Sequence, residues 1–92
     1  MKSALITGAA SGIGKACAQR MAKEGYGVVV ADVNMPAAEE LVKELTAQGL
    51  SAIAVHMDVS SEEEVEAGFD KMVETYGSCD LVMSNAGVQI VH

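Results

Sequence analysis

Four short runs of apolar residues punctuate the chain, at residues 4–7, 28–31, 52–57 and 81–83. The second run is built from valine and alanine without alternation, which is typical of a strand buried on both faces. Between the runs, apolar residues recur three or four positions apart, the spacing of one helix face. The pattern therefore predicts four strands separated by three helices.

Glycines and a polar capping residue mark the ends of the first two helices. The first is predicted over residues 13–24 and is followed by Gly25 and Gly27, because glycine accepts the left-handed conformation at helix ends. Asn34 is suited to cap the second helix, whose first turn tolerates Pro36. The buried faces are expected to hold Ala16, Cys17, Met21 and the other alanines in the first helix and Leu41, Val42 and Leu45 in the second.

The third helix has two candidate start positions. Ser60 and Ser61 are each followed three residues later by a glutamate, the spacing of a capping box, so both remain open as the N-cap. One face of this helix is predicted to carry Val65, Phe69, Met72, Val73 and Tyr76.

The predicted order of elements is β-α-β-α-β-α-β, which implies an α/β fold with a parallel sheet. Right-handed crossovers then favour the strand order 3-2-1-4, with two helices on one face and the third helix on the other. This is the first half of a three-layer, Rossmann-type doubly wound fold. In such a half-fold we expect the fourth strand to be an open edge, and the face with one helix to expose valine and leucine side chains.

Composition limits the chain to one small domain over residues 1–92 and excludes several classes of partner. The net charge of −7 opposes binding to a nucleic-acid backbone, which depends on lysine and arginine contacts. No apolar stretch approaches the roughly 20 residues that cross a bilayer, so no membrane partner is expected. No metal site is identified.

The cysteines and the first residues bear on the cellular compartment. Residues 1–10 lack the pattern of a secretory signal. Cys17 and Cys79 form a lone, widely spaced pair, which is more typical of reduced core residues than of a disulfide. We therefore expect a cytoplasmic protein.

The turn after the first strand, TGAASGIG at residues 7–14, is the first candidate for chemistry. It holds Gly8, Gly12 and Gly14 between a strand and a helix, where a chain without Cβ atoms can approach a ligand closely. The amides at the start of the helix can bind a pyrophosphate. Although a glycine-rich turn alone is a weak signal, this setting favours a dinucleotide site over a plain turn.

Asp32 supports that hypothesis independently. It closes the second strand twenty positions after Gly12, where a carboxylate can accept hydrogen bonds from the adenosine ribose. A 2′-phosphate there would meet like charge, and neither Val33, Asn34 nor Ser11 is basic. The sequence therefore favours NAD over NADP, although a solvated acid at a strand end is the plain alternative for Asp32 alone.

Together, TGAASGIG, Asp32, Asp58-Val59 and Asn85-Ala86-Gly87 resemble the N-terminal cofactor half of the short-chain dehydrogenase/reductase family. The resemblance implies a partial NAD(P)-binding Rossmann domain over residues 1–92. The cofactor-binding residues that it implies are Gly8, Ser11, Gly12, Ile13, Gly14, Asp32, Asp58, Val59, Asn85, Ala86 and Gly87. Of these, Asp58 would accept from the adenine amino group, and the 85–87 turn would pass beside the nicotinamide-side ribose.

The tail SNAGVQIVH is similar to the D-3-hydroxybutyrate dehydrogenase branch of that family. There, a glutamine in the place of Gln89 helps to hold a small carboxylate substrate. An uncharged amide can donate hydrogen bonds to such a carboxylate. A surface-loop glutamine is an equally supported alternative.

The catalytic residues that the family implies are absent from these 92 residues. Family members use a tyrosine with a lysine four positions later, but Val30 follows Tyr26 and Asp80 follows Tyr76 at that spacing. We therefore expect the chain to hold only the cofactor half of a longer NAD-dependent oxidoreductase. The resemblance implies a homo-oligomer acting on a small alcohol, ketone or hydroxy acid. Alternatives are a non-catalytic dinucleotide-binding module, a self-associating fragment and, with less support, a methyltransferase of similar topology.

Overall fold

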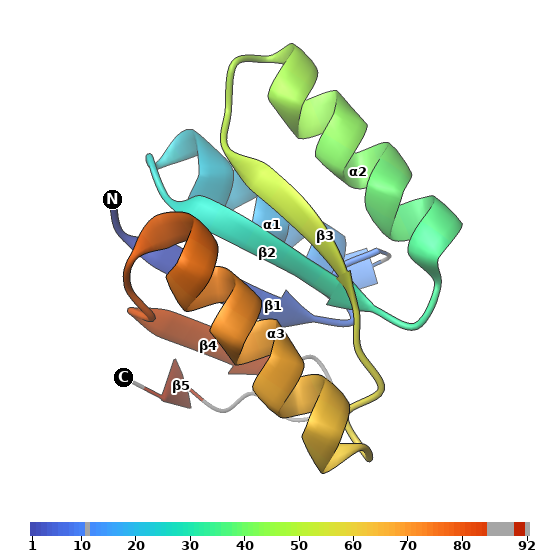
Figure 1. Ribbon diagram of the computed structural model, residues 1–92. Helices are drawn as coiled ribbons and strands as arrows, with labels where there is room; N and C mark the ends of the chain where they lie inside the picture. The colour runs from blue at the N-terminus through green and yellow to red at the C-terminus, as the bar shows by residue number, and fades with distance from the viewer. Residues whose placement is uncertain (11, 85–89, 92) are drawn as a thin grey trace.

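The computed structural model describes residues 1–10, 12–84 and 90–91 (Figure 1). Its elements are β1 (Ser3–Thr7), α1 (Gly12–Lys23), β2 (Gly27–Asp32), α2 (Met35–Ala47), β3 (Ala52–His56), α3 (Glu62–Tyr76), β4 (Leu81–Ser84) and β5 (Ile90–Val91). The predicted alternation of four strands and three helices is confirmed, and β5 is an additional strand.

The strands form one sheet in the order β3-β2-β1-β4-β5. All pairs among the first four strands are parallel, so the predicted order 3-2-1-4 is confirmed. The predicted open edge at β4 is wrong, because β5 pairs with it antiparallel through Val82 with Val91 and Met83 with Ile90. Two residues are too few to show an alternating pattern, so periodicity gave no sign of β5.

Helices cover both faces of the sheet, and alternate strand residues contact opposite layers. In Figure 1, α3 crosses the sheet on the viewer's side and α1 lies behind it. Val28 and Val30 pack with α1 and α2, whereas Leu5 and Val29 belong to the cluster under α3. Leu5 and Val29 are buried, so the expectation that the single-helix face would expose its valines and leucines is wrong for them, whereas Val55 and Val82 of the same face are only partly buried.

The helix caps agree with the predicted chemistry and resolve one ambiguity. Asn34 caps α2 by accepting a hydrogen bond from the amide of Ala37. Ser61, rather than Ser60, is the N-cap of α3, and its hydroxyl accepts from the amide of Glu64 at 3.4 Å. This choice places three glutamates in the first turn of α3, where the helix dipole favours negative charge.

Two details of the predicted helix faces are wrong. Ala16 is exposed, whereas Ala18 and Ala22, two of the other alanines expected on this face, are buried together with Gly14. Val73 of α3 is 49% exposed, whereas Met72 is fully buried. A helix packs through a narrower strip than the arc that an i, i+4 pattern selects, and Gly14 in that strip carries no apolar signal.

No helix in the described ranges is both long enough and apolar enough to cross a membrane.

Candidate functional site

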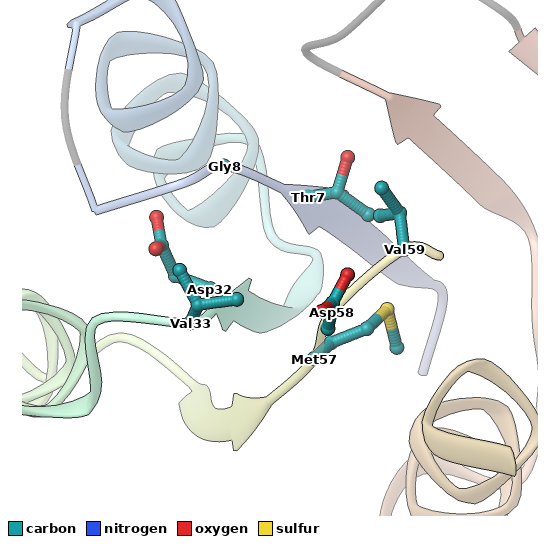
Figure 2. Close-up of a pocket in the computed structure, with 7 residues that line it drawn as sticks. All are labelled: Thr7, Gly8, Asp32, Val33, Met57, Asp58 and Val59. Carbon is teal, nitrogen blue, oxygen red and sulfur yellow. The ribbon is translucent and has the colours of Figure 1, made fainter. Parts of the chain in front are cut away.

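A pocket of about 270 Å³ lies where β1, β2 and β3 end (Figure 2). Because these strands are parallel, their carboxyl ends meet at one edge of the sheet, the place where open α/β sheets bind ligands. The pocket is lined by Thr7, Gly8, Asp32, Val33, Met57, Asp58 and Val59. Residues from three separate stretches of sequence therefore form one site.

The glycine-rich turn brings the start of α1 into close contact with the end of β1. Gly8 and Gly12 have φ values of 62° and 58°, a conformation that favours glycine. A Cβ atom on Gly14 would lie 2.3 Å from the carbonyl oxygen of Gly8. Since that neighbour is backbone, only glycine at position 14 permits this approach. The turn therefore places the amino end of a twelve-residue helix beside the pocket.

Asp32 ties the glycine-rich turn to the second strand. Its Oδ2 accepts a hydrogen bond from the amide of Ala10 at 3.0 Å, and its Oδ1 accepts from the amide of Asn34 at 3.0 Å. The amide of Ala9 also donates to the carbonyl of Ala31 at 3.4 Å. In Figure 2 the Asp32 side chain points toward the turn that contains Gly8. Asp32 is thus more than a solvated acid, since its carboxylate holds two loops in place.

The carboxylate of Asp32 retains capacity for a ligand. A carboxylate offers about four lone-pair sites, and among the described residues two loop amides occupy one on each oxygen. It lines the pocket at intermediate exposure, so further hydrogen-bond donors can reach it. Vicinal hydroxyls are suited to this arrangement because they can donate to both oxygens.

Asp58 stands opposite, at the end of β3. Its Oδ1 accepts from the hydroxyl of Ser60 at 2.7 Å and from the amide of Ser60 at 2.9 Å. These two hydrogen bonds, with a smaller contribution from the charge of His56, hold the pKa of Asp58 below its usual range. Asp58 is therefore ionised at neutral pH and presents an acceptor to the pocket.

The backbone of Asp58 is held from α3. Glu64 Oε1 accepts a hydrogen bond from the amide of Asp58 at 3.1 Å and is 2.7 Å from Nδ1 of His56. The amide of Ser61 donates to the carbonyl of Asp58 at 2.9 Å. The peptide groups on both sides of the Asp58 side chain are thereby fixed to the start of α3.

Most of the site residues expected from the sequence fall at this edge of the sheet. Gly8, Asp32, Asp58 and Val59 line the pocket, and Gly12, Ile13 and Gly14 form the first turn of α1. Ile13 is 73% exposed and lies outside the pocket lining. The remaining expected residues, Ser11, Asn85, Ala86, Gly87 and Gln89, lie outside the described residues.

Sequence reasoning missed three residues that line the pocket, which are Thr7, Val33 and Met57. Each is the immediate neighbour of an expected site residue at a strand end, and that adjacency was the available signal. Val33 is 59% exposed and Val59 is 54% exposed. Two exposed valines at one pocket form apolar walls that can contact a flat ring. The sequence alone does not distinguish such wall-forming valines from ordinary loop residues.

The chemistry of the pocket fits a nucleotide better than a metal ion. The carboxylates suit the hydroxyls of a ribose, and the apolar walls suit a heterocycle. The glycine turn at the start of a helix suits a phosphate. Over residues 1–10, 12–84 and 90–91, no group of three or more His, Cys, Asp or Glu side chains could hold a metal ion. Cys17 and Cys79 are free thiols; Cys17 is partly buried, but Cys79 is exposed, so the expectation that both are core residues is wrong for Cys79.

Comparisons with known proteins agree with this geometry. The family model described as short chain dehydrogenase matches residues 2–92. An uncharacterized oxidoreductase of Bacillus subtilis (strain 168), YuxG, is 46% identical over 95% of this chain. A hydroxysteroid dehydrogenase from Escherichia coli has 42% identity and a TM-score of 0.89 over 94% of this chain. A short chain dehydrogenase/reductase from Burkholderia phymatum, solved in complex with NAD, has 40% identity and a TM-score of 0.87 over 89% of it.

The chain spans only part of these relatives, namely 13% of the Bacillus protein, 37% of the Escherichia chain and 29% of the Burkholderia chain. The family match nevertheless covers nearly every residue of the sequence and coincides with the strand order, the glycine turn and the two acidic strand ends. The chain therefore belongs to the short-chain dehydrogenase/reductase family.

Proposed function

We propose that the chain is the cofactor-binding part of an NAD-dependent oxidoreductase acting on a secondary alcohol or ketone. The observation that carries this proposal is that Asp32 and Asp58 both line one pocket beside the start of α1. When bound, NAD supplies the hydride acceptor, and the protein supplies its placement. The relative solved in complex with NAD supports the choice of cofactor.

In this proposal the adenosine part of NAD occupies the pocket. The Asp32 carboxylate accepts from the ribose hydroxyls while it continues to hold the amide of Ala10. The adenine ring lies against Val33 and Val59, and its amino group donates to Asp58. An ionised Asp58 suits this role because it can only accept hydrogen bonds.

The phosphates and the second half of the cofactor extend along the glycine-rich turn. Gly8, Gly12, Ile13 and Gly14 are proposed to line the pyrophosphate, with Ser11 on the adenosine-phosphate side. The absence of a Cβ at Gly14 keeps the start of α1 against Gly8, so that helix amides face the ligand. Asn85, Ala86 and Gly87 are proposed to pass beside the nicotinamide-side ribose.

The preference for NAD over NADP gives the experiment that tests this function. Calorimetric titration of the purified chain with each cofactor should show NAD binding at least about tenfold more tightly, since a 2′-phosphate beside the Asp32 carboxylate meets like charge at partial burial. Tighter binding of NADP would contradict the role of Asp32. Failure of both cofactors to bind a folded chain would contradict the proposed function.

The substrate is proposed to be a short hydroxy acid such as 3-hydroxybutyrate, held in part by Gln89. The longer protein is proposed to be a cytoplasmic homo-oligomer that binds neither nucleic acid nor membrane.

Because no tyrosine of these 92 residues is followed by lysine at the fourth position, we propose that this chain alone has no turnover. NADH formation by the purified chain with a hydroxy acid would contradict that statement.

A further inference from the structure

Glu64 is unusual because its side chain bonds residues outside α3 instead of the N-cap residue of its own helix. In a capping box, the glutamate three positions after the N-cap bonds the amide of the N-cap residue. Here the amide of Ser61 donates to the carbonyl of Asp58 instead, and Glu64 Oε1 accepts from the amide of Asp58 at 3.1 Å. The carboxylate is therefore directed at the residue that carries the proposed adenine acceptor.

His56 fixes Glu64 from the other side. Its Nδ1 lies 2.7 Å from the same Oε1 atom, and the two side chains are 53% and 37% exposed. At that exposure the contact itself contributes little to stability. What the contact does achieve is to restrict the rotamer of Glu64 against the end of β3.

The contacts of Glu64 affect how the side chain of Asp58 is oriented. Both hydrogen bonds from Ser60 go to Oδ1, so within the described part of the chain Oδ2 keeps its acceptor sites for a ligand. The direction of Oδ2 depends on where the Asp58 backbone lies, and that backbone is held by Glu64 through its amide and by Ser61 through its carbonyl. Figure 2 shows Asp58 on the wall between Met57 and Val59, the segment that this bracing controls.

We propose that Glu64, held by His56, is a positioning residue for the adenine end of the cofactor site, where it orients Asp58 toward the amino group of the base. This inference rests on the proposed function. It assigns part of the affinity for adenine to a residue on α3 that does not line the pocket.

The test compares NAD with nicotinamide hypoxanthine dinucleotide, which lacks the amino group. Glu64→Ala should weaken NAD binding by about fivefold, the value of roughly one hydrogen bond, and leave binding of the hypoxanthine analogue within about twofold of wild type. Glu64→Gln keeps an oxygen acceptor for the Asp58 amide and should restore NAD binding to within about twofold. Both ligands are measured by calorimetry on variants whose folding is checked by circular dichroism.

Glu63→Ala is the matched control, because it removes the same charge from the adjacent exposed position of the same helix turn. It should leave both affinities unchanged. The positioning role is wrong if Glu64→Ala lowers the affinity for both ligands equally, or if Glu64→Gln binds NAD as weakly as Glu64→Ala does. In either case the proposed function stands. If wild-type chain binds neither dinucleotide, the proposed function itself fails.

Discussion

Replacing Gly14 with alanine is expected to weaken NAD binding by roughly 100-fold and to lower the free energy of unfolding by about 3 kcal/mol. The new Cβ would lie 2.3 Å from the carbonyl oxygen and 2.9 Å from the carbonyl carbon of Gly8, which are backbone atoms. The start of α1 must then move away from β1, and its amides leave the proposed phosphate position. Calorimetry and urea denaturation measure the two effects.

Gly49→Ala provides the control for this substitution. Gly49 has a φ of 80° beyond the end of α2, and an added Cβ would meet nothing within 4 Å. The variant should therefore lose about 1–2 kcal/mol through backbone strain alone and bind NAD as wild type does. Unaltered NAD affinity in Gly14→Ala would contradict the assignment of the turn as a phosphate site.

Asp32→Asn is expected to weaken NAD binding by about 10- to 100-fold and to remove most of the preference over NADP. Hydrogen bonds to a charged group contribute about 1.5–3 kcal/mol, and the amide retains only one acceptor oxygen. That oxygen must then serve the loop amides and the ribose together, since Ala10 and Asn34 now bond different oxygens. Titration with both cofactors measures affinity and preference in one experiment.

Asp70→Asn is the matched control for Asp32→Asn. It makes the same chemical change and removes the same charge at an exposed position of α3. We expect it to bind both cofactors like wild type. If the two variants behave alike, then Asp32 acts only through the net charge of the protein, and the proposed contact with the ribose is wrong.

The parallel core could be predicted from the sequence because its physical signature is local. Val28, Val29 and Val30 are apolar without alternation, and the structure buries all three because helices cover both faces of β2. The glycine turn and Asp32 were recognisable for a similar reason, since a strand, a tight turn and a helix follow one another directly in the chain. The alternation of elements and the preference for right-handed crossovers predicted the strand order, and the glycine turn and Asp32 predicted the edge of the sheet that holds the pocket.

The features that sequence reasoning missed depend on contacts between distant residues or on very short elements. Strand β5 has two residues, which is too short for any periodicity. Gly68 is buried on α3, where a Cβ would overlap the methyl group of Met57, yet a glycine contributes nothing to an apolar pattern. Glu64 matches a capping box in sequence, but its real partners are His56 and Asp58, outside the helix.

Under the proposed function, the adenosine half of a dinucleotide binds where β1, β2 and β3 end. Titration of ¹⁵N-labelled chain with ADP-ribose, followed by amide chemical shifts, tests it most directly. The largest changes should occur at Gly8, Ala10, Val33 and Val59, around the described pocket. Changes centred instead on the outer surface of α2, around Glu40 and Lys43, or on Cys17 and Met83 beside α1, would contradict it.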